Sequence, residues 1–178
     1  MNIQDFETMY IAGLREARGL EERLLLTWPK LAEAAEDREL AEAFRAHINE
    51  TARQLDSMRA IFDRNSASLA DAEDGTLDAL LAKVNAIVAG MEPGALRDAA
   101  LISAVQRIEH YQIAVYGTLA EYAKLMGRHD EKRAFGAILE EERAVDADLS
   151  DIATSFVNPH AMASKGHGGS KARSGVAA

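Results

Sequence analysis

The sequence predicts an all-α fold, a four-helix bundle, and three observations favour it. Strong helix formers (alanine, leucine, glutamate and arginine) dominate the chain of 178 residues. Apolar residues recur with the 3.6-residue period of a helix over four long stretches. Only 3 prolines and 12 glycines occur, and we find none of the short β-branched runs between turns that a sandwich or barrel needs. With 48% hydrophobic residues, the chain can bury the core of one domain.

The first two long helices form one predicted hairpin. The first spans about residues 5–35, and Pro29 is expected to kink it rather than end it, because the apolar period resumes afterwards. A tight connection follows at residues 36–38, with Asp37 as the N-cap of the next helix. That second helix covers about residues 38–64. The short link makes the two helices antiparallel neighbours.

The second hairpin follows a connection of about 30 residues that is long enough to cross the bundle. It holds a polar loop at residues 65–75, a shorter helix at about 76–89 and a break at 90–94. The third and fourth long helices cover about 95–126 and 130–156. Two short links and one long crossover are the topology of the ferritin-type bundle. We therefore expect one ferritin-like domain over residues 1–158, and a disordered, low-complexity tail over 159–178.

Charge and composition exclude several classes of partner. The chain has 20 Lys and Arg against 29 Asp and Glu, a net charge of −9, so it should repel nucleic acid and anionic membranes. No apolar run approaches the roughly 20 residues of a membrane span, and the N-terminus lacks the pattern of a signal peptide. The absence of cysteine excludes disulfides and thiolate sites. These features predict a cytoplasmic protein that binds neither nucleic acid nor membrane.

Four carboxylates fall in phase with the apolar stripes, one on each long helix: Glu21, Glu50, Glu109 and Glu142. An ionised carboxylate in an apolar interior is costly unless it is paired, and the cations in phase with these stripes are too few. Two metal ions would balance the charge. Glu50 follows Glu21 by 29 residues, and Glu142 follows Glu109 by 33. This internal duplication is typical of bundles that hold two metals.

Further candidate ligands lie one helical turn from these acids. His47 precedes Glu50 by one turn, and a metal ligand and a hydrogen-bonded core histidine are equally open interpretations. Gln54, Gln112 and Asp146 follow their respective glutamates by about one turn. Tyr116 is expected to pack in the core with its hydroxyl hydrogen-bonded, rather than to carry redox chemistry. The other four histidines, including His110 at the surface, are not expected to be ligands.

Three segments carry a resemblance to a known family. Residues 43–51, AFRAHINET, resemble the AFxxHLxET segment of the YciE/YciF family of bacterial stress proteins, a ferritin-like group. Residues 98–118, DAALISAVQRIEHYQIAVYGT, are similar to its segment DAALIxxxQxxEHYEIxxYGT. Residues 139–146, LEEERAVD, match its LEEExxxD segment. The resemblance covers about residues 5–157.

The resemblance implies di-metal ligands at Glu21, Glu50, Glu109 and Glu142, with His47, Gln54 and Asp146 as secondary candidates. Two departures from the family pattern stand out. Gln112 occupies a position where the family usually has Glu, which removes one charged oxygen, and residues 20–23, LEER, keep only the key acid of the family's AEKQ. Asp78 aligns with a glutamate of the family's crossover helix and is an additional candidate. The resemblance also implies a role in the stress response, but no substrate.

An oxygen-rich donor set with little histidine favours hard or borderline ions, which are iron, manganese or, in a crystal, magnesium or calcium. Two ions are expected, with iron first and manganese second. A pair of irons in such a site can reduce dioxygen or peroxide, with Glu50 and Glu142 as the expected bridges. The alternative is a non-catalytic metal-binding or scaffold protein whose ions stabilise the bundle, so enzyme activity stays open.

A homodimer, rather than a hollow storage cage, is the expected assembly. A cage needs a further short helix after the bundle, and the sequence after Phe156 predicts none. Tyr10, Ile11 and Tyr122 fall out of phase with the main stripes and predict an exposed apolar surface. A twofold pairing of such surfaces is the commonest way to cover them.

Overall fold

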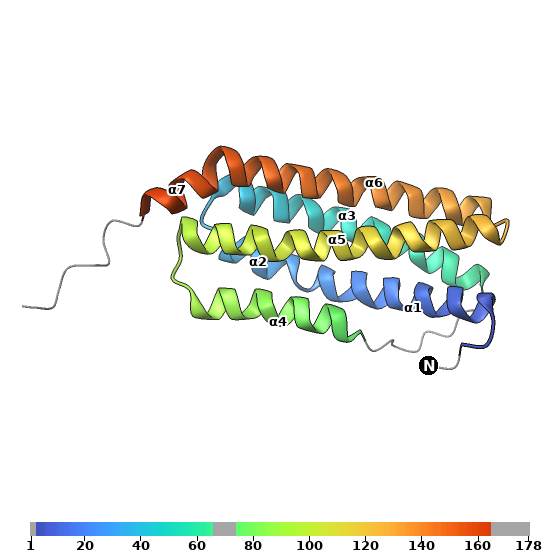
Figure 1. Cartoon of the computed structure of the whole chain (residues 1–178). Coiled ribbons are helices and arrows are strands. Elements are labelled where there is room, and N and C mark those ends of the chain that lie inside the picture. The colour runs from blue at the N-terminus through green and yellow to red at the C-terminus, as the bar shows by residue number, and fades with distance from the viewer. Residues whose placement is uncertain (1–2, 66–73, 165–178) are drawn as a thin grey trace, which may run out of the picture.

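The computed structural model describes residues 3–65 and 74–164, and its regular elements are all helices (Figure 1). The first hairpin consists of α1 (Phe6–Leu25), α2 (Trp28–Ala34) and α3 (Arg38–Arg64). The second consists of α5 (Ala95–Leu125) and α6 (His129–Ile152), and the crossover carries α4 (Gly75–Gly90). The predicted all-α bundle of two hairpins joined by a crossover helix is confirmed.

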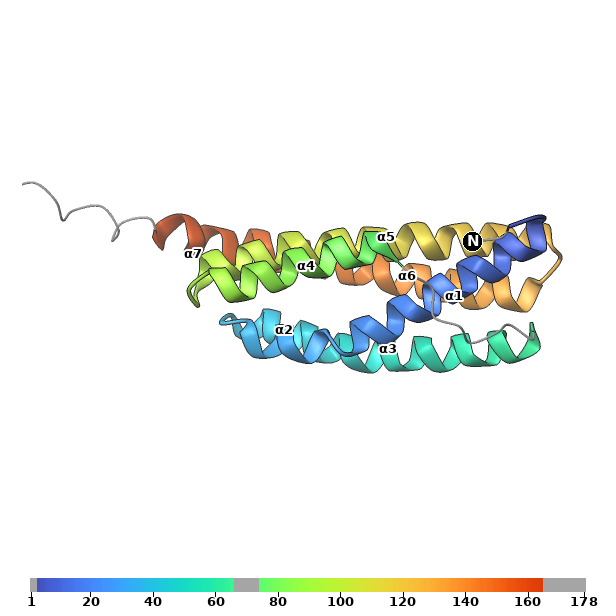
Figure 2. The same ribbon diagram turned by 90° about the horizontal axis from the view of Figure 1, so that it is seen from below.

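The two hairpins pack into a four-helix bundle. α1 contacts both α3 and α5, and α6 contacts both α5 and α3, so each long helix has two long neighbours. α4 lies against the outside of α5 and is much shorter than it (Figures 1 and 2). The interior of the bundle is therefore formed by one face each of α1, α3, α5 and α6.

The first predicted helix is divided in two, which corrects the expectation of a kink. α1 ends at Leu25, and α2 begins at Trp28 with Pro29 in its first turn. Pro29 has no N–H to donate to the preceding turn. The hydroxyl of Thr27 instead donates to the carbonyl of Arg23, and the Thr27 N–H donates to the carbonyl of Leu24. These local bonds end α1 at this point, although the apolar period of the sequence continues into α2.

The C-terminal end of the bundle also differs from the prediction. Helical structure continues beyond α6 through a π-helical turn (Ala153–Val157) into α7 (Asn158–Ala163). The predicted tail boundary at residue 159 is therefore too early, and the expectation that no short helix follows Phe156 is wrong. Pro159 lies in the first turn of α7, a position where proline is common. The rest of the predicted tail, residues 165–178, lies outside the described residues.

Asp98 holds the turn between α2 and α3 against the second hairpin. Its carboxylate accepts hydrogen bonds from the backbone N–H groups of Glu36 (3.1 Å) and Asp37 (2.8 Å). Asp37 in turn caps α3 by accepting from the N–H of Leu40, as predicted. A buried side chain of α5 thus determines where the first hairpin turns.

The core is divided into two apolar clusters along the bundle axis. One contains Leu24, Trp28, Phe44, Ile108 and Leu149, and the other contains Leu14, Met58, Tyr116 and Phe135. Tyr10 also belongs to the second cluster and is fully buried, so its predicted exposure is wrong. Between the two clusters, each of the four long helices places buried polar side chains, which form a polar layer across the bundle.

Candidate metal centre

The polar layer consists of six side chains from the four long helices. Its members are Glu21 of α1, His47 and Gln54 of α3, Glu109 and Gln112 of α5, and Glu142 of α6, all at most 2% exposed. Among the described residues, eight buried side-chain nitrogen or oxygen atoms lack a hydrogen-bond partner, and seven of these belong to the polar layer. Such orphaned atoms are rare in native proteins and require an explanation.

Three of these side chains converge on one point. His47, Glu109 and Glu142 each offer one ligand atom, and the three atoms lie within 4.8 Å of one another. Nε2 of His47 is 3.8 Å from Oε1 of Glu109 and 3.6 Å from Oε2 of Glu142. These separations are too long for hydrogen bonds. A cation can lie between such atoms and bind all three.

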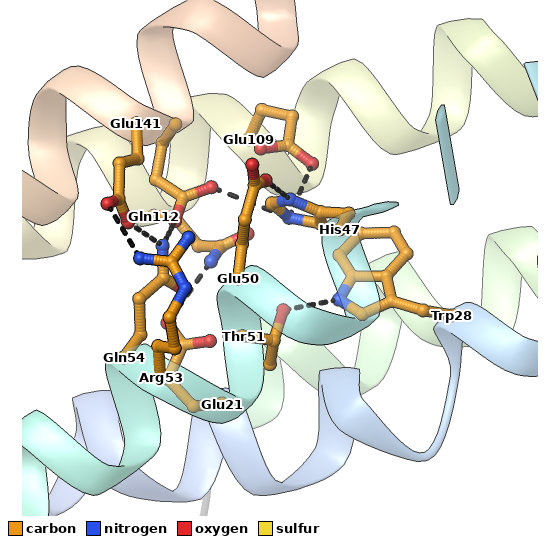
Figure 3. Close-up of polar contacts among 11 residues, drawn as sticks. Glu21, Trp28, His47, Glu50, Thr51, Arg53, Gln54, Glu109, Gln112 and Glu141 are labelled. Carbon is orange, nitrogen blue, oxygen red and sulfur yellow. Dashed lines mark hydrogen bonds and ion pairs between the residues drawn. The ribbon is translucent and has the colours of Figure 1, made fainter. Parts of the chain in front are cut away.

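The ring of His47 is held in its orientation from two sides (Figure 3). Nδ1 of His47 lies 3.0 Å from Oε2 of Glu50, a hydrogen-bond distance that leaves Nε2 facing the carboxylates. The indole of Trp28 meets the ring edge-on at 4.7 Å, and its Nε1 donates to the hydroxyl of Thr51 at 2.9 Å. Metal-binding histidines commonly have one nitrogen occupied in this way. The helix break before α2 positions Trp28 for this contact.

Glu21 is held from α5. Its Oε1 accepts hydrogen bonds from Nε2 of Gln112 at 3.1 Å and from the hydroxyl of Tyr116 at 2.5 Å. Its Oε2 has no hydrogen-bond partner. Tyr116 is fully buried with its hydroxyl hydrogen-bonded, as predicted. One oxygen of Glu21 is therefore oriented by the protein and the other is left as a free donor atom.

Glu142 is positioned by Gln54. Nε2 of Gln54 donates to Oε1 of Glu142 at 2.5 Å and to Oε2 of the neighbouring Glu141 at 3.0 Å. Arg53 lies 3.3 Å from Glu141 at the edge of the bundle (Figure 3). Gln54 thus orients a carboxylate, while its own Oε1 has no hydrogen-bond partner.

Burial and mutual repulsion make the layer's carboxyl groups reluctant to ionise. Burial is the main cause that raises the pKa of Glu21 to about 8, and the charge of Glu142 is the second cause. The hydrogen bonds from Tyr116 and Gln112 lower this pKa and only partly offset the increase. Burial and the charges of Glu142 and Glu21 raise the pKa of Glu109 well above its ordinary value. Burial also raises the pKa of Glu142, although His47 opposes the shift. A nearby cation would reverse these shifts, because it stabilises the ionised form.

The donor set fits hard or borderline metal ions. It contains three buried carboxylates, two amide oxygens and one imidazole nitrogen, and each of these groups has at least one unpartnered atom. Oxygen donors with a single imidazole suit iron and manganese. The ligand atoms of His47, Glu109 and Glu142 lie close enough together to hold one such ion.

Two predicted ligands lie at the rim rather than inside the layer. The side chain of Glu50 is 33% exposed, and its contact is with His47. The hydrogen bond from His47 is the main cause that lowers the pKa of Glu50 below its ordinary value. Asp146, with 22% of its side chain exposed, is turned toward Gln106 at 3.1 Å and His110 at 3.6 Å. The sequence duplication is therefore not matched by a symmetric arrangement of side chains.

The remaining candidates lie away from the layer. Asp78 is exposed on α4 and pairs with Arg23 at 2.5 Å. His110 is exposed, as predicted. The pair of Trp28 and Thr51 was not predicted as part of the site, although Thr51 follows His47 by one helical turn and lies on the same buried face of α3.

Comparisons with known proteins agree with this architecture. A family model described as a domain of unknown function (DUF892) matches residues 5–162. Protein YciF of Escherichia coli is 34% identical over 162 residues, which cover 90% of this chain and 98% of that protein. None of the described helices combines the length and apolar character needed to cross a membrane.

Solved structures of similar proteins share this fold. The crystal structure of the E. coli stress protein YciF matches with a TM-score of 0.83 and 33% identity, over 88% of this chain and 99% of that one. YcfI of Rhodopseudomonas palustris matches with a TM-score of 0.80 and 28% identity, over 84% and 95%. A Xanthomonas campestris protein at 17% identity shares the fold, with a TM-score of 0.70 over 89% and 97%. The chain therefore belongs to the DUF892 family, the YciE/YciF family of bacterial stress proteins.

Proposed function

We propose that this chain is a ferritin-like di-metal carboxylate protein of the bacterial stress response. Iron is the expected metal and manganese the second choice. The observation that carries the proposal is the set of seven unpartnered, buried donor atoms at the middle of the bundle. Leaving so many buried polar atoms without partners would cost a free energy comparable with the whole stability of a typical domain. Two bound cations would satisfy them. The stress role follows from the relation to YciF.

The chain's own residues would prepare the site for small oxidants. Two irons, when bound, supply the electrons that reduce dioxygen or peroxide. Glu50 and Trp28 orient His47, Gln54 orients Glu142, and Tyr116 with Gln112 orients Glu21. The apolar clusters cover the layer at both of its ends along the bundle axis. Preorganised ligands of this kind bind metal without a large rearrangement of the protein.

Anaerobic titration with ferrous ion tests the metal site. We expect two ions per chain, and we expect Glu109→Gln and Glu142→Gln each to reduce the bound iron to less than one ion per chain. Glu140→Gln is the matched control, because Glu140 neighbours the site on α6 but is exposed. Full iron binding by both buried variants would show that the site is wrongly assigned.

Oxidation of the loaded protein distinguishes the two functions that the sequence left open. Turnover of ferrous ion with dioxygen or hydrogen peroxide, followed by absorbance, supports an oxidoreductase. Tight binding of two ions without turnover supports a non-catalytic metal-binding or scaffold protein. The same assay with Glu140→Gln should match the unmodified chain in either case.

A further inference from the structure

A cavity of about 80 Å³ lies beside the polar layer, bordered by α2, α3, α5 and α6. Most of its wall is apolar, and the larger apolar residues are Trp28, Phe44, Val105, Val145 and Leu149. The polar part of the wall includes His47, Glu50 and Glu109. The cavity therefore reaches the polar layer on the side of the His47 ring. There it borders the metal position proposed at His47 and Glu109.

The cavity also reaches the protein surface. His47 and Glu109 are buried, whereas Ala46 and Asp148, which line the same cavity, are exposed. Ala43 of α3 also lines the cavity and is half-buried, so its exposure is between that of the outer and the inner lining residues. A continuous lining from exposed to buried residues makes this a route from solvent to the site. The small side chains of Ala43 and Ala46 keep the route open where α3 faces α6.

The chemistry of the wall restricts what can enter. An anion would lose its hydration against the apolar residues, at a large cost. The charged groups at the outer part, Glu50 and Asp148, are both acidic and would repel anions. A water molecule needs only about 10–15 Å³ of such volume, so the cavity has room for a small molecule. A small uncharged molecule fits all three restrictions.

The opposite side of the layer is filled by protein. Glu21 is fully buried there, and the hydroxyl of Tyr116 and the amide of Gln112 both donate to its Oε1. Tyr116 and Gln112 are themselves fully buried. A molecule that reaches the site through the cavity therefore arrives next to His47 and Glu109, not next to Glu21.

We propose that this cavity is a binding subsite and access route for small uncharged molecules, which it delivers to the metal position beside His47 and Glu109. Ala43 is the residue whose size controls passage. Delivery to a metal ion rests on the proposed function. The existence of a subsite for small gas molecules does not rest on it, because the cavity is formed by the protein alone.

Xenon tests the subsite without any metal, because xenon occupies apolar cavities. Crystals of the metal-free chain under xenon pressure should show xenon between Phe44, Val105 and Leu149. Ala43→Leu should remove this xenon, and Ala60→Leu, an exposed position on the same helix, should retain it. Melting temperatures close to that of the unmodified chain verify that both variants fold. Absence of xenon from this cavity in the unmodified protein would overturn the proposal.

Nitric oxide, a small uncharged diatomic, tests the route in the ferrous protein. We expect Ala43→Leu to slow its association on the order of tenfold, with unchanged iron content, while Ala60→Leu binds it at the original rate. Equal rates in all three proteins would overturn the route. Failure of the unmodified chain to bind iron would refute the proposed function instead, and the xenon result would still decide on the subsite.

Discussion

Tyr116 and Glu21 join the two hairpins inside the bundle, with the tyrosine hydroxyl 2.5 Å from Oε1 of the carboxylate. Both side chains are fully buried, one on α5 and the other on α1. This hydrogen bond stabilises the buried carboxyl group of Glu21 through Oε1, so that Oε2 is free to bind a metal ion. It also connects the polar layer to the apolar cluster around Phe135, whose ring lies 6.4 Å from that of Tyr116.

Replacing Tyr116 by phenylalanine should destabilise the metal-free protein by about 1–3 kcal/mol, because a buried oxygen of Glu21 loses a donor. Urea unfolding of the metal-free chain measures the change. Tyr122→Phe is the matched control, since Tyr122 is half-buried and its hydroxyl donates to the sulfur of Met9 at 3.8 Å rather than to a carboxylate. Equal stability of the two variants would show that the bond to Glu21 contributes nothing.

The stability of the metal-free protein should fall as the pH rises from about 5 to 8. The pKa of Glu21 is raised to about 8 in the folded state, so the folded protein binds more protons than the unfolded chain in this range. The contribution of Glu21 is complete below its unfolded pKa and is lost as the pH rises through its folded pKa. The full slope for one such group is about 1.4 kcal/mol per pH unit. Urea unfolding at several pH values should show the decline, and Glu21→Gln should flatten it.

Added manganese should raise the melting temperature, and more so at pH 8 than at pH 6. Metal binds only the folded site, which stabilises it by mass action, and it competes with protons for the raised carboxyl groups. At a concentration a hundred times the dissociation constant, the gain is about 2.7 kcal/mol. Calorimetry with and without manganese gives the comparison. The same increase in a Glu109→Gln, Glu142→Gln double variant would mean that manganese acts elsewhere on the protein.

Replacing Gln112 by glutamate should strengthen metal binding and weaken the metal-free protein. The amide of Gln112 donates to Glu21 at 3.1 Å, and a carboxylate there would place two acids in contact. Without metal we expect a loss of about 1–3 kcal/mol, and with metal an affinity at least about tenfold higher. Isothermal titration with manganese measures the second effect. An unchanged affinity would show that position 112 does not face a metal ion.

The chain is expected to form a homodimer of twice 19.3 kDa. A groove of about 300 Å³ between α1 and α5 is lined mainly by apolar residues, among them Met9, Ala12, Val115 and Tyr122. α4 lies beside the N-terminal half of α5 and leaves the C-terminal half, which lines this groove, uncovered (Figure 1). Light scattering should give the dimer mass, and Val115→Glu should give a monomer with the same iron content. A particle of several hundred kDa would contradict the prediction.

The helical period predicted the fold and most of the inward positions. Glu21, Glu109 and Glu142 were expected in the interior, and all three are fully buried. Period alone succeeds here because a residue in phase with a wide apolar stripe must turn inward whenever the helix packs. It succeeds less well at the margin of a stripe. Glu50 lies about 60° around α3 from His47, and only the rotation of α3 against α5 and α6 decides that His47 is buried and Glu50 is at the rim.

The sequence by itself therefore determined the helices, the crossover topology and a layer of acids in the middle of the bundle, because these follow from local periodicity and link lengths. Only the tertiary structure decided which donor atoms meet. The convergence of His47, Glu109 and Glu142, the support of Trp28 and the cavity next to Ala43 depend on distances between helices. Those distances are set by the packing of side chains that lie far apart in the sequence.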